Sequence, residues 1–193
     1  MALRAAQIEY SVVRASEWES DSALAELRRV NPLGQIPTLV LQDGTVLTES
    51  AAILIYLGLE YPGCGLLPEN TSGRANALRG LVFIAANCYS AVSISDYPDR
   101  WTTSKTKAAH ERVRTAARAQ LHRNWSIFLE QFSPELERTK ANPGALAFLT
   151  VVVSRWSGTR KHLQTEGHAV TELLAVLEQH PRIAGVLREH SAA

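Results

Sequence analysis

Two short segments, Gly34–Pro37 and Thr48–Ser50, carry the residue types best suited to hold a small polar ligand. Ser50 is expected at the start of a helix, where a hydroxyl and the unpaired backbone N–H groups of the first turn favour an anion. Ser50 could also serve only as an N-cap, and Glu49 only as a favourable acid beside the first turn. Capping and anion binding are compatible, so the pattern indicates a binding site rather than an acid–base pair.

The elements that would position these segments alternate between strand-like and helix-like pieces up to about Tyr61. Apolar and polar residues alternate from Ile8 to Val13, which predicts a half-buried strand. Ser20 or Asp21 is expected to cap a short helix, and Asn31-Pro32 to end it. The apolar residues of that helix are Leu24, Leu27 and Val30.

A β-hairpin is expected immediately before the Ser50 helix. Its strands would be Thr38–Leu41 and Thr45–Leu47, joined by a type I′ turn at Asp43-Gly44, since Asp-Gly readily adopts the positive φ angles of that turn. The helix that begins at Ser50 would bury Ile53, Leu54 and Leu57.

A segment rich in Pro, Gly and Asn, residues 63–73, is expected to be a linker, and everything after it looks helical. Asp96–Trp101 would separate two long helices. Asn142-Pro143 is predicted to start a further apolar segment that runs through Val153, and its three adjacent valines leave helix and strand both open. The apolar residues at helical spacing are Leu78, Leu81, Val82, Ala85 and Tyr89 in the first long helix; Val113, Ala117, Leu121, Trp125, Phe128 and Phe132 in the second; and Leu173, Leu174 and Leu177 in a last helix.

The segment from Asn31 to Ile53 resembles the glutathione site of the cytosolic glutathione transferases, over more than twenty residues and with both binding elements at the proper separation. The linker and the Tyr97–Trp101 break resemble bacterial members more weakly. Taken alone, Gly-Gln-Ile-Pro would be no more than a turn before a strand. The Thr48–Ser50 helix start in register with it favours the binding interpretation.

The resemblance implies a role for each residue of the segment. The Ile36–Pro37 bond would be cis, so that the backbone of Ile36 can pair with the cysteinyl part of glutathione like an added strand. Ser50 would hold the γ-glutamyl carboxylate, and Glu49 would meet the ammonium group or orient neighbouring donors. Gln35 would add a polar contact. Glutathione is therefore the expected co-substrate.

By the same resemblance, roughly twenty residues of a first strand and helix start would precede Met1. Family members activate the glutathione thiol with a Tyr, Ser or Cys near the end of that strand. No residue of this sequence matches that position, so the catalytic residue is unknown. Without this neighbour, the expected strand from Ile8 to Val13 would have to shift, pair with a swapped segment or remain disordered.

The first long helix and the loop after it line the electrophile pocket in the family. Tyr89, Tyr97, Arg100 and Trp101 are therefore candidates to contact an aromatic or anionic second substrate. The alternative is that Tyr89 packs in the core and Trp101 only anchors its loop.

Composition excludes several other classes of function. The 193 residues include 46% hydrophobic and 20% charged side chains and have a net charge of +1, with no basic stripe for a nucleic acid. Cys64 and Cys88 form no CxxC pair, which fits a reducing cytoplasm, and the longest apolar run, Ala145 to Val153, is too short to span a bilayer. The six histidines show no metal-ligand spacing and are expected at the surface, namely His110, His122, His162, His168, His180 and His190.

The sequence thus predicts an α/β plus all-α protein. An incomplete thioredoxin-like glutathione-binding domain would span residues 1–62, followed by the linker at 63–73 and an all-helical domain at 74–193. The leading hypothesis is a cytoplasmic, dimeric transferase of the bacterial type that joins the glutathione thiol to a small electrophile, with no nucleic-acid or membrane partner. The alternative is a catalytically impaired binding or protein-interaction module.

Overall fold

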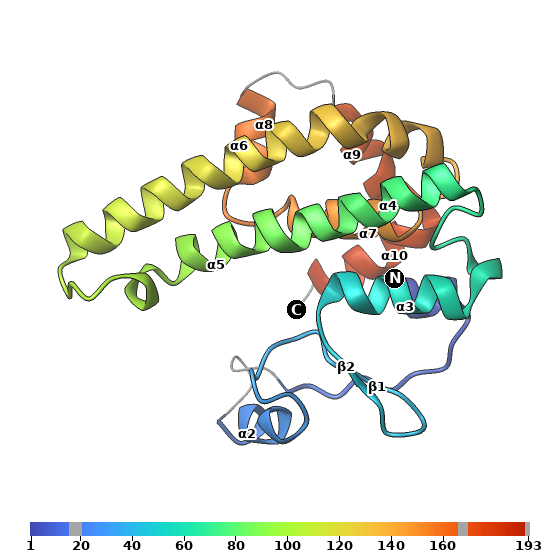
Figure 1. Ribbon diagram of the computed structural model, residues 1–193, viewed down its shortest axis with the longest axis horizontal. Helices are drawn as coiled ribbons and strands as arrows, with labels where there is room; N and C mark the ends of the chain where they lie inside the picture. The colour runs from blue at the N-terminus through green and yellow to red at the C-terminus, as the bar shows by residue number, and fades with distance from the viewer. Residues whose placement is uncertain (16–20, 166–169, 192–193) are drawn as a thin grey trace.

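The computed structural model describes residues 1–15, 21–165 and 170–191. Most of the molecule is a layered helical body, and a small hairpin with one helix lies below it in the view of Figure 1. A long rod of helices α4 (Thr71–Phe83), η2 (Ile84–Tyr89) and α5 (Ser90–Asp96) runs antiparallel to α6 (Lys107–Thr139). The short 3₁₀ helix η3 (Pro98–Trp101) lies at their turn and confirms the predicted break.

The apolar face of α6 forms the centre of the core. Trp125, Phe128 and Phe132 are completely buried, as the helical spacing predicts. Phe83 of α4 packs on this face, with its ring centroid 5.8 Å from that of Phe128 and 6.0 Å from that of Phe132. Tilted and edge-on aromatic pairs at such distances add to the apolar burial that joins α4 to α6.

The rod contains a six-residue π-helical turn, η2, between α4 and α5. An extra residue per turn leaves backbone groups without their ordinary partners. Asn124 of α6 compensates, because its side-chain amide donates to the carbonyl of Asn87 at 2.8 Å. The hydroxyl of Ser90 donates to the carbonyl of Ala86 at 2.9 Å. The irregular turn is thus held by side chains, one of them from the neighbouring helix.

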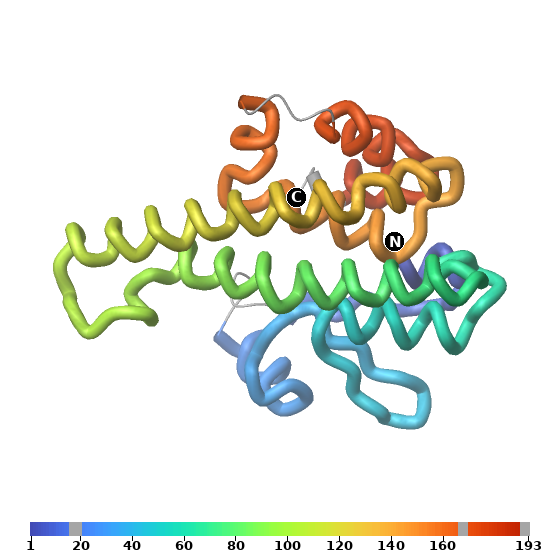
Figure 2. Tube along the Cα trace, turned by 45° about the horizontal axis from the view of Figure 1, so that its top comes forward, coloured from blue at the N-terminus to red at the C-terminus, as the bar shows by residue number. Residues whose placement is uncertain are grey.

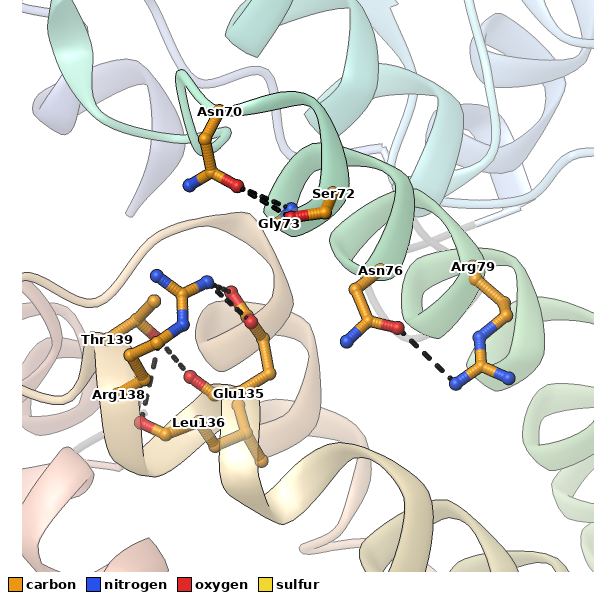
Figure 3. Close-up of polar contacts among 9 residues, drawn as sticks. All are labelled: Asn70, Ser72, Gly73, Asn76, Arg79, Glu135, Leu136, Arg138 and Thr139. Atoms are coloured by element: carbon orange, nitrogen blue, oxygen red, sulfur yellow. Dashed lines mark hydrogen bonds and ion pairs between the residues drawn. The ribbon is translucent and has the colours of Figure 1, made fainter.

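The start of α4 lies beside the end of α6 (Figure 3). Asn70 caps α4 by accepting from the N–H of Gly73 at 2.7 Å. On α6, Arg138 donates to both carboxylate oxygens of the buried Glu135 at 2.6 Å. A Cβ atom on Gly73 would come within 2.9 Å of the Arg138 guanidinium, so the two helix ends touch.

Four more helices complete the helical body: α7 (Ala145–Val153), α8 (Thr159–Thr165), α9 (Val170–Gln179) and α10 (Pro181–Ser191). The three valines of α7 are helical, which resolves the open choice between helix and strand. The predicted last helix is α9, with Leu173, Leu174 and Leu177 buried. It is not the last, because α10 follows, and the sequence prediction also missed α8.

The predicted cap of α7 is wrong. Gly144, rather than Asn142, precedes the helix, and a Cβ atom there would lie 2.5 Å from the carbonyl oxygen of Leu66. Asn142 instead accepts a hydrogen bond from Arg182 of α10 at 2.6 Å. The Arg182 guanidinium also donates to the carbonyl oxygens of Pro143 and Cys64, and so ties α10 to the linker.

The predicted linker is packed rather than loose. Leu66 and Leu67 are buried within it, and a short 3₁₀ helix, η1 (Pro62–Cys64), precedes them. The carbonyl of Leu66 accepts from the first N–H of α7 at 2.8 Å. The segment is therefore part of the contact between helix α3 (Ser50–Glu60) and the helical body.

The hairpin is present with a different turn from the one expected. Strands β1 (Leu39–Val40) and β2 (Val46–Leu47) pair antiparallel, with Leu39 opposite Leu47. The N–H of Leu41 donates to the Thr45 carbonyl, which leaves a three-residue loop. Only Gly44 of this loop has a positive φ, +86°, as in a type I turn followed by a glycine bulge. The type I′ prediction is wrong because Asp43 keeps a negative φ and accepts from the Thr45 N–H instead.

The strand expected at Ile8–Val13 does not form. Helix α1 (Ala2–Ala5) ends just before it, and the N–H of Ile8 donates to the Leu3 carbonyl. Residues 8–15 belong to no helix or strand. A cavity of about 930 Å³ is lined by this segment and by Thr38–Asp43, with Leu27, Val30 and Leu57 also on its wall. No strand among the described residues pairs with the segment. The predicted helix that follows is confirmed as α2 (Asp21–Val30), while Ser20 lies outside the described residues.

One helical stretch, Thr71–Asp96, is long and apolar enough to cross a membrane by length and composition alone. In the fold it is the rod that packs on α6 and α7. Its residues Ala77, Leu81, Ile84, Cys88 and Ala91 are buried in the shared core. We therefore interpret the stretch as a core helix of the helical body.

Two histidines depart from the predicted surface placement. The rings of His122 on α6 and His162 on α8 stack with centroids 4.1 Å apart and planes 4° from parallel. The Nε2 atom of His122 is buried without a hydrogen-bond partner among the described residues. His168 lies outside the described residues.

Candidate functional site

The loop before β1 is organised by a buried asparagine. Asn31 directly follows α2, and its amide donates to the carbonyl of Gln35 at 2.9 Å and to the hydroxyl of Thr38 at 3.1 Å. Its side-chain oxygen accepts from the N–H of Leu33. These bonds close the loop around Gly34, whose φ of +61° a larger residue would strain.

The Ile36–Pro37 bond is cis, as the resemblance implies. Ile36 is 61% exposed at the outside of the loop, and Gln35 is also exposed. The loop therefore presents the residue before the cis proline to solvent, where an extended ligand could reach it.

Helix α3 begins at Ser50, as predicted, and Glu49 occupies the N-cap position. Glu49 has a φ of +64° and makes no side-chain capping bond. Ser50 is therefore not the N-cap of α3, so the interpretation that it serves only as a cap is wrong. With no side chain capping its first turn, α3 directs unpaired N–H groups and the positive end of its dipole toward an exposed site.

The hairpin brings these two segments to one place. Its register pairs Leu39 with Leu47 and Val40 with Val46. The cis-proline loop leads into β1 at Leu39, and β2 leads out at Leu47 toward Glu49 and Ser50. The cis-proline loop and the start of α3 therefore leave the same end of the ladder, although thirteen positions separate Ile36 from Glu49.

A tyrosine from the helical body reaches the start of α3. The hydroxyl of Tyr89, at the end of η2, lies 3.2 Å from the hydroxyl of Ser50. The ring of Trp156, from the loop after α7, packs edge-on against Tyr89 with centroids 5.5 Å apart. Burial raises the pKa of Tyr89, and the charge of Glu49 acts in the same direction.

The other predicted second-substrate residues lie further along the rod. Tyr97 follows α5, and the Arg100 guanidinium lies 4.0 Å from the centroid of its ring. Trp101 is 55% exposed. Eight helical residues separate Tyr97 from Tyr89, roughly 12 Å along the axis. The structure thus brings Tyr97 and Arg100 together at the tip of the helical hairpin, and Tyr89 apart from them beside Ser50.

The chain is similar to several known proteins. The family model for the glutathione S-transferase N-terminal domain matches residues 1–59. The uncharacterized GST-like protein YncG of Escherichia coli (strain K12) is 35% identical over 112 residues, 58% of this chain and 54% of the relative. Glutathione S-transferase GstA of Escherichia coli O157:H7 is 34% identical over 107 residues, 55% of this chain and 49% of that protein. The matches thus span about half the length of these curated relatives.

Among solved structures, a glutathione transferase homologue from Sulfitobacter, crystallised with bound glutathione, superposes with a TM-score of 0.75. The superposition covers 98% of this chain and 90% of that one at 20% identity, which establishes the shared fold. The N-terminal part of the chain is therefore similar to the glutathione S-transferase N-terminal domain, and the chain shares the fold of a glutathione transferase homologue. The predicted fold class is confirmed: a thioredoxin-like N-terminal part followed by a helical C-terminal part.

Within this fold, sequence reasoning missed two residues that shape the candidate site. Asn31 was noted only as the end of a helix, yet it holds the loop that carries Ile36. Its position directly before a proline and a Gly-containing loop was the available signal. Trp156 was not noted at all, because its contact with Tyr89 joins residues 67 positions apart. No local pattern could have found that contact.

Proposed function

We propose that this protein is a glutathione transferase that binds glutathione across the cis-proline loop and the start of α3. The observation that carries the proposal is the hairpin, since the pairing of Leu39 with Leu47 brings the cis-proline loop and the start of α3 to the same end of one ladder. Glutathione has an extended peptide backbone and a carboxylate at one end. It needs an exposed backbone segment and an anion site side by side, and the two segments meet both needs.

Each part of the ligand has a partner in this proposal. The backbone of Ile36 pairs with the cysteinyl residue, and Gln35 adds a polar contact. The Ser50 hydroxyl and the first-turn N–H groups of α3 hold the γ-glutamyl carboxylate. Glu49 attracts the adjacent ammonium group. The positive φ of Glu49 supports this role, because residues in such conformations gather at functional sites.

The reaction is transfer of the glutathione sulfur to a small electrophile. The thiolate attacks the electrophilic atom, a carbon–sulfur bond forms and the leaving group departs with its electron pair. Tyr97, Arg100 and Trp101, with the ring of Tyr89, face the second substrate. The paired Tyr97 ring and Arg100 cation suit an aromatic or anionic compound.

The assembly and location follow from the surface and the relatives. Val40 and Val46 on the hairpin and Val82 on α4 are 38% to 54% exposed, and a second copy of the chain would cover them. We propose a homodimer of the bacterial type in the cytoplasm. Residues 1–62 form its glutathione-binding domain, 63–73 the linker and 74–193 the helical domain.

The test is isothermal calorimetry with glutathione, followed by a conjugation assay with chlorodinitrobenzene. Glutathione should bind with one site per chain, and Ser50→Ala should weaken binding about tenfold by removing a hydrogen bond to a charged group. Glu49→Gln should weaken it in the same direction. Thr106→Ala, which removes a hydroxyl that caps the distant helix α6, is the matched control and should leave affinity unchanged.

The outcomes separate the candidate functions. Binding with turnover supports the transferase, whereas binding without turnover identifies the impaired binding module. Absence of binding to the folded protein overturns the glutathione-site assignment.

A further inference from the structure

The contact between Tyr89 and Ser50 joins the two halves of the fold at the proposed ligand site. The two hydroxyl oxygens lie 3.2 Å apart, and either atom could be the donor. Ser50 opens α3, whereas Tyr89 closes the π-helical turn of the rod. Ser50 is half-buried, with its hydroxyl beside that of Tyr89.

The tyrosine is held in place from two sides. Trp156 packs against its ring, and the π-helical turn that ends at Tyr89 is fixed by the Asn124 amide on the Asn87 carbonyl. An added residue in a helical turn rotates every later side chain by about 100°. Without the extra residue of η2, Tyr89 would therefore point in another direction, away from Ser50.

The protonation of Tyr89 makes it a dependable donor. Burial, the largest influence, raises the pKa of its phenol above the ordinary value of 10.0; the hydrogen bond with Ser50 lowers it, and the nearby carboxylate of Glu49 raises it. The phenol therefore keeps its proton at neutral pH. Ser50 has one proton to give and two lone pairs to accept with, so it can accept from Tyr89 and donate elsewhere at the same time.

We propose that Tyr89 is a positioning residue for the carboxylate-binding site: its phenolic proton goes to Ser50 Oγ, which directs the proton of Ser50 toward the anion at the start of α3. The proposal rests on the proposed function and adds a residue from the helical domain to the γ-glutamyl site. When two hydroxyls form a chain of hydrogen bonds that ends on a carboxylate, each hydrogen bond strengthens the other. Tyr89 thus acts on the carboxylate through Ser50.

The experiment is Tyr89→Phe, which removes only the phenolic oxygen and keeps the ring against Trp156. Calorimetry should show about a fivefold loss of affinity for glutathione, the size expected for one hydrogen bond. Affinity for γ-aminobutyryl-cysteinyl-glycine, which lacks the γ-glutamyl carboxylate, should be the same in the variant and the unaltered protein. Adding Tyr89→Phe to Ser50→Ala should cost nothing further. Tyr61→Phe, at a ring that is 39% exposed beside the linker, is the control and should not change binding.

Three results would overturn the inference. Suppose that the unaltered protein binds glutathione and that Ser50→Ala weakens this binding. An unchanged affinity of the Tyr89→Phe variant would then reject the role of Tyr89 and leave the proposed function in place. An equal loss of affinity for glutathione and the analogue would reveal a merely structural role. Failure of the unaltered, folded protein to bind glutathione would remove the proposed function together with the inference.

Discussion

The helical body and the segment at residues 8–15 differ in how far their sequence patterns become regular structure. Helix α6 runs through 33 residues with Pro134 inside it, and it buries Trp125, Phe128 and Phe132 completely. Residues 8–15 carry a strand pattern but belong to no helix or strand. They line a cavity, and Val12 and Val13 are 74% and 81% exposed. Figure 2 shows the two regions on opposite sides of the α4–α5 rod.

The difference shows that a helical sequence pattern can satisfy its backbone hydrogen bonds locally, whereas a strand pattern cannot. A helix needs only its own backbone and one apolar neighbour, so its sequence pattern suffices. A strand pattern needs a second chain segment at 4.7–4.9 Å, and apolar alternation cannot supply one. Stability should therefore be concentrated in the helical body, and the following variants test that expectation.

The largest effect is expected at the centre of the core. Phe128→Ala should lower the free energy of unfolding by about 3–5 kcal/mol, because it removes a buried ring and leaves a cavity. Val13→Ala should change it by no more than about 0.5 kcal/mol, because that side chain is mostly exposed. Urea unfolding followed by circular dichroism measures both. Comparable losses at the two positions would contradict the contrast between the regions.

A smaller effect is expected where Arg182 of α10 is bonded to the linker at residues 63–73. Arg182→Ala should lower the free energy of unfolding by about 1–3 kcal/mol, because the carbonyls of Cys64 and Pro143 lose their donor. Arg123→Ala is the control, since that guanidinium donates to Gln120, one turn away on the same helix α6. Thermal unfolding compares them. A loss no larger than that of the control would show that α10 does not hold the linker.

Glu49→Gly tests whether the site stores backbone strain. Glycine tolerates a φ of +64°, so the variant should be more stable by about 1 kcal/mol, yet bind glutathione more weakly. Gln7→Gly relieves a similar angle, φ +56°, outside the site and should leave binding unchanged. Unfolding curves and calorimetry on the same samples give both quantities. A Glu49→Gly variant that binds as well as the unaltered protein would remove the carboxylate from the site.

The smallest effect is a pH dependence within the helical body. Burial, His162 and Arg118 lower the pKa of His122 below 6.5, so the unfolded chain binds a proton there before the folded chain does. Stability should therefore fall as the pH drops through 6.5 toward the lower pKa of the folded state. His122→Gln should flatten this slope in unfolding experiments between pH 7.5 and 5.5. A slope that survives the substitution would assign the dependence to other groups.

Much of the site could be predicted from the sequence because its elements are local. The helix start at Ser50 depends on residues within a few positions, whereas the cis bond at Ile36–Pro37 was expected from the family resemblance. The hairpin was also found, but its turn type was not, since Asp43 bonds the Thr45 N–H rather than adopting a positive φ. The predicted cap of α7 was wrong for a related reason. Gly144 is needed before the helix because Leu66, far away in the chain, approaches too closely for a Cβ atom.

The sequence by itself predicted most of the helices and the resemblance of residues 31–53 to a glutathione site, because periodicity and short motifs depend on neighbours in the chain. Only the tertiary structure decided that residues 8–15 form no strand, that Asn124 holds the π-helical turn, and that Tyr89 meets Ser50. Those outcomes depend on atoms from segments that are far apart in the chain. Their energies arise from packing and hydrogen bonds that exist only after the chain has folded.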